Sequence, residues 1–108
     1  MTDVLVCSSD KNMRGLLARH LRDGGYDVRR AADTIAAGYA VLAAAPDLIV
    51  FDAQTHELEW LRFCAVLKAD RSIPRSPALF VSNQEDGMQR AIRVGAAGWL
   101  TKIGRAHV

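Results

Sequence analysis

The sequence has few of the residues that mark disulfide-linked, metal-binding or membrane proteins. Its two cysteines, Cys7 and Cys64, lie in apolar surroundings without CxxC or metal-ligand spacing, so we expect free buried thiols in a reducing cytosol. No apolar run has the length of a signal peptide or a membrane span, and we therefore expect a cytoplasmic protein without membrane contact. The net charge of +2 comes from scattered residues, which argues against direct nucleic-acid binding.

The composition favours one soluble globular domain. The chain has 108 residues, of which 50% are hydrophobic and 24% charged, and this is close to a common domain size. Its apolar residues occur in short runs that each end at a polar residue. The clearest run starts after Pro46 and leads through Leu48-Ile49-Val50-Phe51 into Asp52. It predicts a strand buried on both faces, with a carboxylate at the sheet edge where α/β folds place their ligands.

Strands and helices alternate along the whole chain. We expect strands at 4–7, 26–31, 48–52, 78–82 and 99–102, the second of them at a sheet edge. Asp10 and Asp33 are the expected N-caps of the first two helices, the third helix is expected at 57–68, and a fourth ends at Gly95. Such alternation implies right-handed crossovers and a parallel sheet.

The helices also have predicted inner faces. We expect the first helix to turn Met13, Leu16, Leu17, His20 and Leu21 inward, and the second to do so with Ile35, Tyr39 and Leu42. In the third helix the apolar spacing i, i+3, i+4, i+7 starts at Trp60.

With the fifth strand, the pattern resembles the receiver domain of bacterial two-component response regulators. The segment from Pro46 to Asp52 matches the phosphoacceptor strand of that family, Ser82 matches its switch Ser/Thr, and 95–102 matches the segment that ends in its lysine, Lys102. The resemblance covers residues 1–102. It implies a flavodoxin-like, doubly wound, five-stranded parallel sheet in the order 2-1-3-4-5.

The resemblance also implies a function in phosphorelay signal transduction rather than an enzyme. Asp52 is then the phosphoacceptor, Ser82 donates a hydrogen bond to the phosphoryl group, and Lys102 neutralises its charge. Trp99 resembles the aromatic switch residue coupled to Ser82. The implied partners are a histidine kinase or phosphotransfer protein and a downstream effector domain or protein.

One departure from the family concerns its metal site. Two acidic residues normally follow the first strand and hold Mg²⁺ together with the phosphoacceptor, but Ser8 and Ser9 occupy those positions. The remaining candidate ligands are Asp52, the backbone of Gln54 and, weakly, Asp10, which we expect to cap the helix instead. We therefore expect weak Mg²⁺ binding and inefficient phosphorylation. The alternative is a pseudo-receiver, the same fold acting as a protein-interaction module without phosphorylation.

Two other phosphate-handling classes fit less well. A haloacid-dehalogenase-like phosphatase needs a second aspartate two residues after the first, where this chain has Gln54. A flavodoxin-type mononucleotide binder needs a glycine-containing loop after the first strand, and residues 7–12 contain no glycine. His56 is a weak candidate for touching the site from its loop.

The resemblance implies a fifth helix after the fifth strand, and the last six residues, 103–108, end before it. Their back-translation, ATC GGA AGA GCA CAC GTC, resembles the start of a sequencing adapter, and we interpret them as a non-native tail. Without a fifth helix, we expect some of Val4, Val6, Trp99 and Leu100 to lack cover and the chain to associate.

Overall fold

One mixed sheet forms the centre of the protein, whose computed structural model describes residues 2–54, 56–82, 87–101 and 106–107. The strands lie in the order β2-β1-β3-β4-β5-β6, and all pairs are parallel except β5 with β6. The strands are β1 (Asp3–Cys7), β2 (Asp27–Ala31), β3 (Leu48–Asp52), β4 (Ala78–Ser82), β5 (Gly98–Thr101) and β6 (Ala106–His107). The predicted five-stranded parallel order 2-1-3-4-5 is confirmed, and β6 is an addition that its two residues did not signal.

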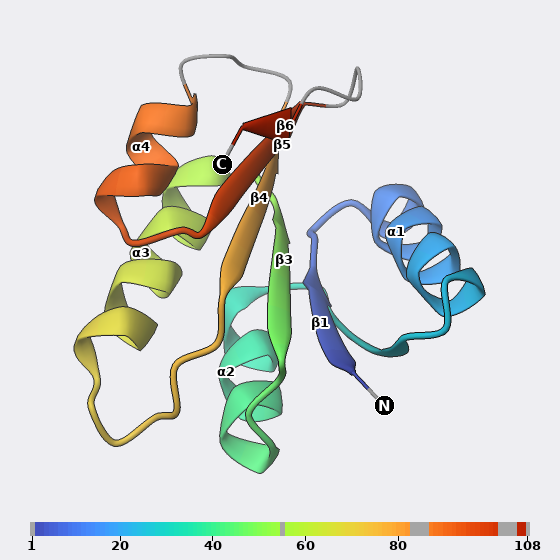
Figure 1. Cartoon of the computed structure of the whole chain (residues 1–108), viewed down its shortest axis with the longest axis horizontal. Coiled ribbons are helices and arrows are strands. Elements are labelled where there is room, and N and C mark those ends of the chain that lie inside the picture. The colour runs from blue at the N-terminus through green and yellow to red at the C-terminus, as the bar shows by residue number, and fades with distance from the viewer. Residues whose placement is uncertain (1, 55, 83–86, 102–105, 108) are drawn as a thin grey trace.

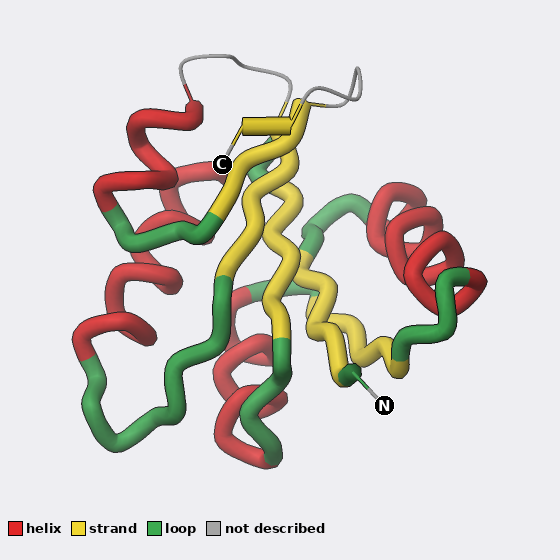
Figure 2. The backbone as a smooth tube through the Cα atoms, viewed as in Figure 1, coloured by secondary structure: helices red, strands yellow, loops and turns green. Residues whose placement is uncertain are grey.

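Helices cover both faces of this sheet, as in a doubly wound fold. They are α1 (Lys11–Asp23), α2 (Thr34–Ala43), α3 (Glu57–Ala69) and α4 (Gly87–Arg93). Helix α1 lies apart from the other three, which gather on the opposite side of the strands (Figure 1, Figure 2). Among the described residues no helix follows β5, and no described helix combines the length and apolar character needed to cross a bilayer.

The core is divided by the sheet into two clusters. The larger contains Phe51, Phe80, Trp60 and Trp99 beneath α2, α3 and α4, with the Phe51 and Phe80 rings stacked at 4.9 Å. The smaller contains Val4, Val6, Val50 and Val81, and half-buried residues of α1 pack against it. Apolar side chains on alternate positions of the same strand thus supply opposite faces, as expected for strands buried on both sides.

Short polar side chains start the first two helices, as predicted. Asp10 accepts hydrogen bonds from the backbone of Asn12 and Met13, and Asp33 accepts one from Ala36. Each carboxylate satisfies amide groups that have no partner within the helix. The chain leaves α1 through Gly24 and Gly25, and the φ of 92° at Gly25 is one that glycine adopts without strain.

The predicted inner face of α2 is wrong. Ile35, Tyr39 and Leu42 are 71%, 73% and 71% exposed, whereas Ala37 and Val41 are buried. Small residues therefore face the sheet, and the large apolar residues face solvent. The same happens partly in α1, where Ala18 is buried while Leu16 and His20 are exposed.

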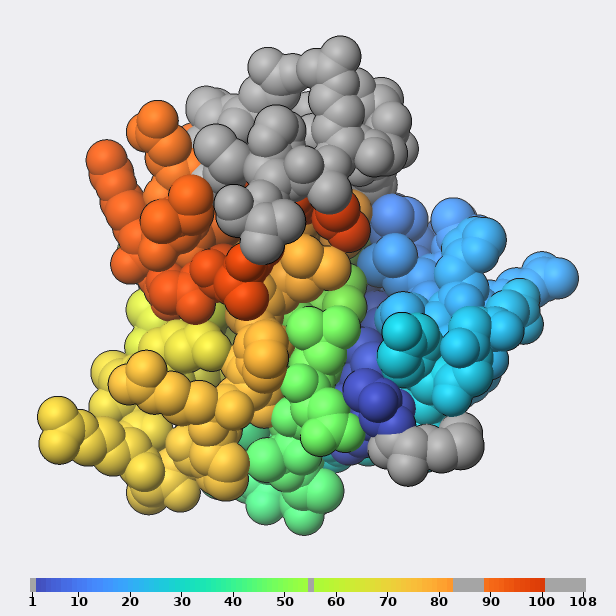
Figure 3. Space-filling view, viewed as in Figure 1, coloured from blue at the N-terminus to red at the C-terminus, as the bar shows by residue number. Residues whose placement is uncertain are grey.

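The expected uncovering of the first and fifth strands is also wrong for three of the four residues. Val4 and Val6 are fully buried, because Met13, Leu17 and Leu21 of α1 pack against their cluster. Trp99 is buried on the opposite face, and only Leu100 is half-buried. On the face of the sheet that α1 covers, segments around β3 and β4 reach the surface beside α1; they are green and orange in Figure 3.

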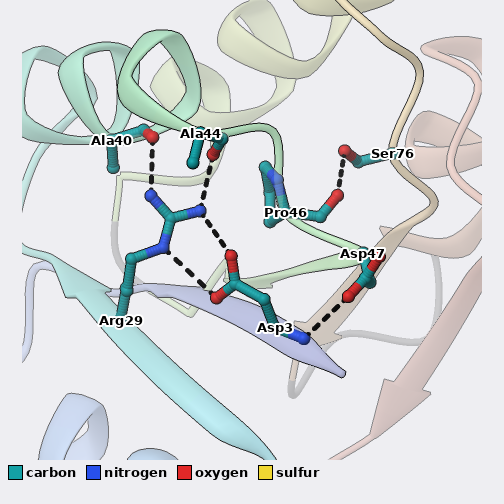
Figure 4. Close-up of polar contacts among 7 residues, drawn as sticks. All are labelled: Asp3, Arg29, Ala40, Ala44, Pro46, Asp47 and Ser76. Carbon is teal, nitrogen blue, oxygen red and sulfur yellow. Dashed lines mark hydrogen bonds and ion pairs between the residues drawn. The ribbon is translucent and has the colours of Figure 1, made fainter. Parts of the chain in front are cut away.

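Arg29 joins the edge strand β2 to its neighbours at the amino end of the sheet. Its guanidinium donates to both oxygens of Asp3, at 3.2 and 2.8 Å, and to the carbonyl oxygens of Ala40 and Ala44 (Figure 4). These carbonyls lie at the end of α2, where the Ala40 oxygen also accepts from the Ala44 backbone N–H at 3.2 Å. One side chain therefore holds β1, β2 and α2 in register.

Candidate functional site

Asp52 ends β3 at the carboxyl edge of the sheet, and its side chain is fully buried. The Ser8 hydroxyl donates to Asp52 Oδ2 at 2.8 Å, and the Gln54 backbone N–H donates to Oδ1 at 3.2 Å. The adjacent strand β4 fixes the position of Asp52, since the backbone N–H of the next residue, Ala53, donates to the carbonyl of Val81 at 2.8 Å. Each carboxylate oxygen thus has a neutral donor, which offsets part of the cost of burial.

Ser8 is placed for this contact by the end of β1. It is fully buried, and its backbone N–H continues the ladder by donating to Ala31 of β2 at 3.1 Å. Its oxygen also accepts a 3.2 Å bond from the backbone N–H of Asp10. A hydroxyl has one proton to donate, and the short contact assigns that proton to Asp52.

Ser9 makes a second link between the same two loops. Its Oγ lies 2.9 Å from Nδ1 of His56, which precedes α3. His56 has φ 58° and ψ 34°, a left-handed backbone that is rare outside glycine and asparagine. Ser8 and Ser9 therefore connect the loop after β1 to the end of β3 and to the residue that precedes α3.

The donor set does not fit a resident Mg²⁺. Asp10 is exposed, and its carboxylate is occupied as the cap of α1, with Oδ1 2.9 Å from the Asn12 nitrogen. Of the carboxylates that the structure describes beside these two loops, Asp52 already accepts the hydrogen bond of Ser8. Within the described ranges there is no group of three His, Cys, Asp or Glu side chains that could hold a metal ion. Mg²⁺ prefers charged oxygen ligands, and neutral hydroxyls replace them poorly.

Of the other predicted site residues, Ser82 lies at the same edge of the sheet. Ser82 ends β4 and is buried, one residue beyond Val81, which is in register with Asp52. Trp99 lies in β5 opposite Phe80, with its side chain in the larger core cluster. Lys102 lies outside the described residues. The structure thus brings Ser8, Asp52 and Ser82 to neighbouring strand ends.

A bidentate ion pair joins the start of α3 to α4. Arg90 Nε lies 2.5 Å from Glu57 Oε1, and Arg90 Nη2 lies 3.2 Å from Oε2. Two parallel hydrogen bonds of this kind define an orientation as well as a distance. The segment that follows Asp52 is thereby connected to α4, the helix that comes after β4 in the chain.

Sequence reasoning missed the two serine contacts and the ion pair. For the Ser8–Asp52 contact a signal exists only once β1 and β3 are taken as neighbours, as the resemblance implies, and Cys7 is then in register with Phe51. The next residues, Ser8 and Asp52, then follow at adjacent strand ends. No comparable signal exists for Glu57 and Arg90, which are 33 residues apart.

Comparison with known proteins gives one consistent family. A family model described as "Response regulator receiver domain" matches residues 4–107. A curated relative, the DNA-binding dual master transcriptional regulator RpaA of Synechocystis sp., is 27% identical over 104 residues, which cover 94% of this chain. The chain spans 43% of the length of that relative.

Solved structures agree with this result. The chemotaxis response regulator CheY4 of Vibrio cholerae has a TM-score of 0.83 at 27% identity, covering 94% of this chain and 87% of its own. NtrX from Brucella abortus, solved with ADP, has a TM-score of 0.83 at 29% identity, covering 97% of this chain and 24% of its own. The alternative prediction of a pseudo-receiver is not favoured by these similarities.

Proposed function

Since the chain belongs to the receiver domain family of response regulators, we propose that Asp52 accepts a phosphoryl group from a histidine kinase or phosphotransfer protein. The observation that carries this proposal is the place of Asp52: a buried carboxylate at the carboxyl end of the central strand, with each oxygen held by one donor. Receiver domains are signalling modules, and this chemistry serves information transfer rather than turnover of a substrate.

The transfer itself needs a nucleophile and compensation for charge. An Asp52 oxygen attacks phosphorus, the P–N bond of the phosphohistidine breaks, and the leaving imidazole keeps the electron pair and takes up a proton. Ser82, at the adjacent strand end, would donate a hydrogen bond to a phosphoryl oxygen. Lys102 would neutralise part of the added charge.

We further propose that this reaction is slow in the present chain. Receiver domains typically bind Mg²⁺ in an acidic pocket, and here neutral serines stand in that pocket. A carboxylate about 4 Å from a divalent ion contributes several kcal/mol of gross attraction at an effective dielectric near 20. Serine hydroxyls do not replace that attraction, so Mg²⁺ would bind weakly and most of the charge compensation would fall to Lys102.

We propose that the output of the signal lies outside this domain. RpaA, which is similar over this domain, is a DNA-binding transcriptional regulator. We propose by analogy that this domain acts on an effector domain or effector protein and does not itself contact nucleic acid.

Incubation with acetyl phosphate tests the proposal directly. Intact-mass spectrometry should detect the addition of one phosphoryl group, and peptide mapping after borohydride reduction of the acyl phosphate should place it on Asp52. The Asp52→Asn variant, which keeps the shape but lacks the nucleophile, should show no addition. Unchanged mass in the native chain under conditions that modify a control receiver domain would instead support the pseudo-receiver.

A further inference from the structure

Helix α2 presents an apolar stripe to solvent. Ile35, Tyr39 and Leu42 are each more than two-thirds exposed, and their spacing i, i+4, i+7 places them on one side of the helix. Single exposed apolar residues are common on proteins, but a contiguous stripe of large ones marks an interaction site. The core does not account for them, because Ala37 and Val41 make the buried contacts of this helix.

A groove between α2 and α3 continues this stripe. It has a volume of about 290 Å³ and is lined by Thr34, Glu59, Arg62, Phe63 and Val66. The two helices come close at Gly38, where an added Cβ would lie 3.9 Å from the Phe63 ring.

The stripe is adjacent to the groove, because Ile35 directly follows Thr34 on the helix. Val66, which is 65% exposed, adds another apolar side chain on α3. We call the stripe and the groove together the α2–α3 surface.

The charges on this surface have both signs. Glu59 and Arg62 are exposed and lie three residues apart on the α3 wall of the groove. Among the residues that the structure describes, neither forms an ion pair. The α2–α3 surface thus combines an apolar stripe with one acid and one base that have room for further partners.

We propose that the α2–α3 surface binds a second copy of this chain. A two-fold axis perpendicular to both helices sets each helix antiparallel to its own copy. Glu59 then faces Arg62 of the second copy, and Arg62 faces Glu59 of the second copy, so one symmetric arrangement forms two ion pairs. The same axis passes over the first turn of α2, because Thr34 lines the groove beside Glu59 and Arg62, so the apolar stripes of the two copies meet at their Ile35 ends.

The charge arrangement selects this occupant over others. A foreign partner would need its own matched acid and base beside an apolar stripe, whereas a second copy already has them. A contact formed by two helices of each copy would fall in the range below about 1,200 Å² of total buried surface that is typical of transient signalling contacts. The dimer should therefore be weak and depend on concentration.

A charge-exchange experiment tests the proposal. Sedimentation velocity over a concentration series should show reversible dimerisation of the native chain. Glu59→Arg and Arg62→Glu should each place like charges opposite each other and raise the dissociation constant by roughly tenfold or more. An equimolar mixture of the two variants restores both ion pairs and should recover the dimer. Circular dichroism melting of each variant confirms that it is folded.

Two further variants separate this surface from the rest of the molecule. Tyr39→Ser should weaken the dimer, whereas Leu16→Ser, which changes an exposed apolar residue of α1 on the other side of the sheet, should leave it unchanged. A native chain that stays monomeric at all concentrations would overturn the proposal. So would a mixture that fails to recover the dimer, or association that responds to Leu16→Ser and not to Tyr39→Ser.

Discussion

Ser8 donates a 2.8 Å hydrogen bond to Oδ2 of Asp52, although the two residues are 44 positions apart in the chain. Both side chains are buried. The contact joins the end of the first strand to the end of the third through a neutral donor and a carboxylate. The Asp52 side chain is therefore fixed by a hydrogen bond within the protein.

The Ser8–Asp52 contact should contribute to folding stability. Ser8→Ala leaves a buried carboxylate oxygen without its donor, and we expect a loss of about 1–3 kcal/mol in the free energy of unfolding. Ser9→Ala is the matched control, because its partner His56 is exposed and surface changes usually stay within about 0.5 kcal/mol. Urea denaturation measures both, and equal losses for the two variants would contradict the assigned role of Ser8.

Restoring two carboxylates should restore a metal site. In the double variant Ser8→Asp, Ser9→Asp, the new side chains adjoin Asp52, and we expect Mg²⁺ affinity to rise at least about tenfold, the equivalent of 1.4 kcal/mol. Mg²⁺ titration followed by the fluorescence of Trp60 and Trp99 measures this change.

Phosphorylation gives the same double variant a second readout. Acetyl phosphate should modify it faster than the native chain, because the bound ion compensates the charge that develops on the phosphoryl oxygens. Adding Asp52→Asn should abolish the gain. Equal rates for the native chain and the double variant would show that Ser8 and Ser9 do not limit the reaction.

Arg29 should be among the more important polar side chains for stability. Arg29→Ala removes the ion pair with Asp3 and the donors to Ala40 and Ala44, with an expected cost of about 1.5–3 kcal/mol. Arg30→Ala changes an exposed neighbour in the same strand and should stay within about 0.5 kcal/mol. Thermal or urea denaturation compares the two, and a similar cost for both would show that the contacts in Figure 4 contribute little.

Both cysteines should be unreactive in the folded protein. Burial raises the pKa of the Cys7 and Cys64 thiols, and for Cys64 the charge of Lys68 opposes the rise only in part. The reactive thiolate is therefore scarcer at pH 8 than for an ordinary cysteine, and access is blocked as well. Intact mass after iodoacetamide treatment at pH 8 should show no alkylation without denaturant and two additions in guanidinium chloride. Rapid native labelling would contradict this burial.

Local sequence signals determined much of the fold. The apolar runs before Asp52 and Ser82 end where β3 and β4 end, and Asp10 and Asp33 cap the helices predicted for them. Such features depend on backbone amide groups and side chains only a few residues away, which a sequence shows directly. The strand order came from the resemblance, and the match of residues 4–107 agrees with it.

Tertiary structure alone decided which side of α2 is buried and how Asp52 is held. Nearly every residue of α2 is apolar or small, so no polar face indicated its orientation. Packing against the sheet buried Ala37 and Val41 and left the larger Ile35, Tyr39 and Leu42 in solvent. Ser8 and Asp52 meet only because β1 and β3 are adjacent in the sheet. A hydrogen bond across 44 residues depends on that adjacency, which no local preference encodes.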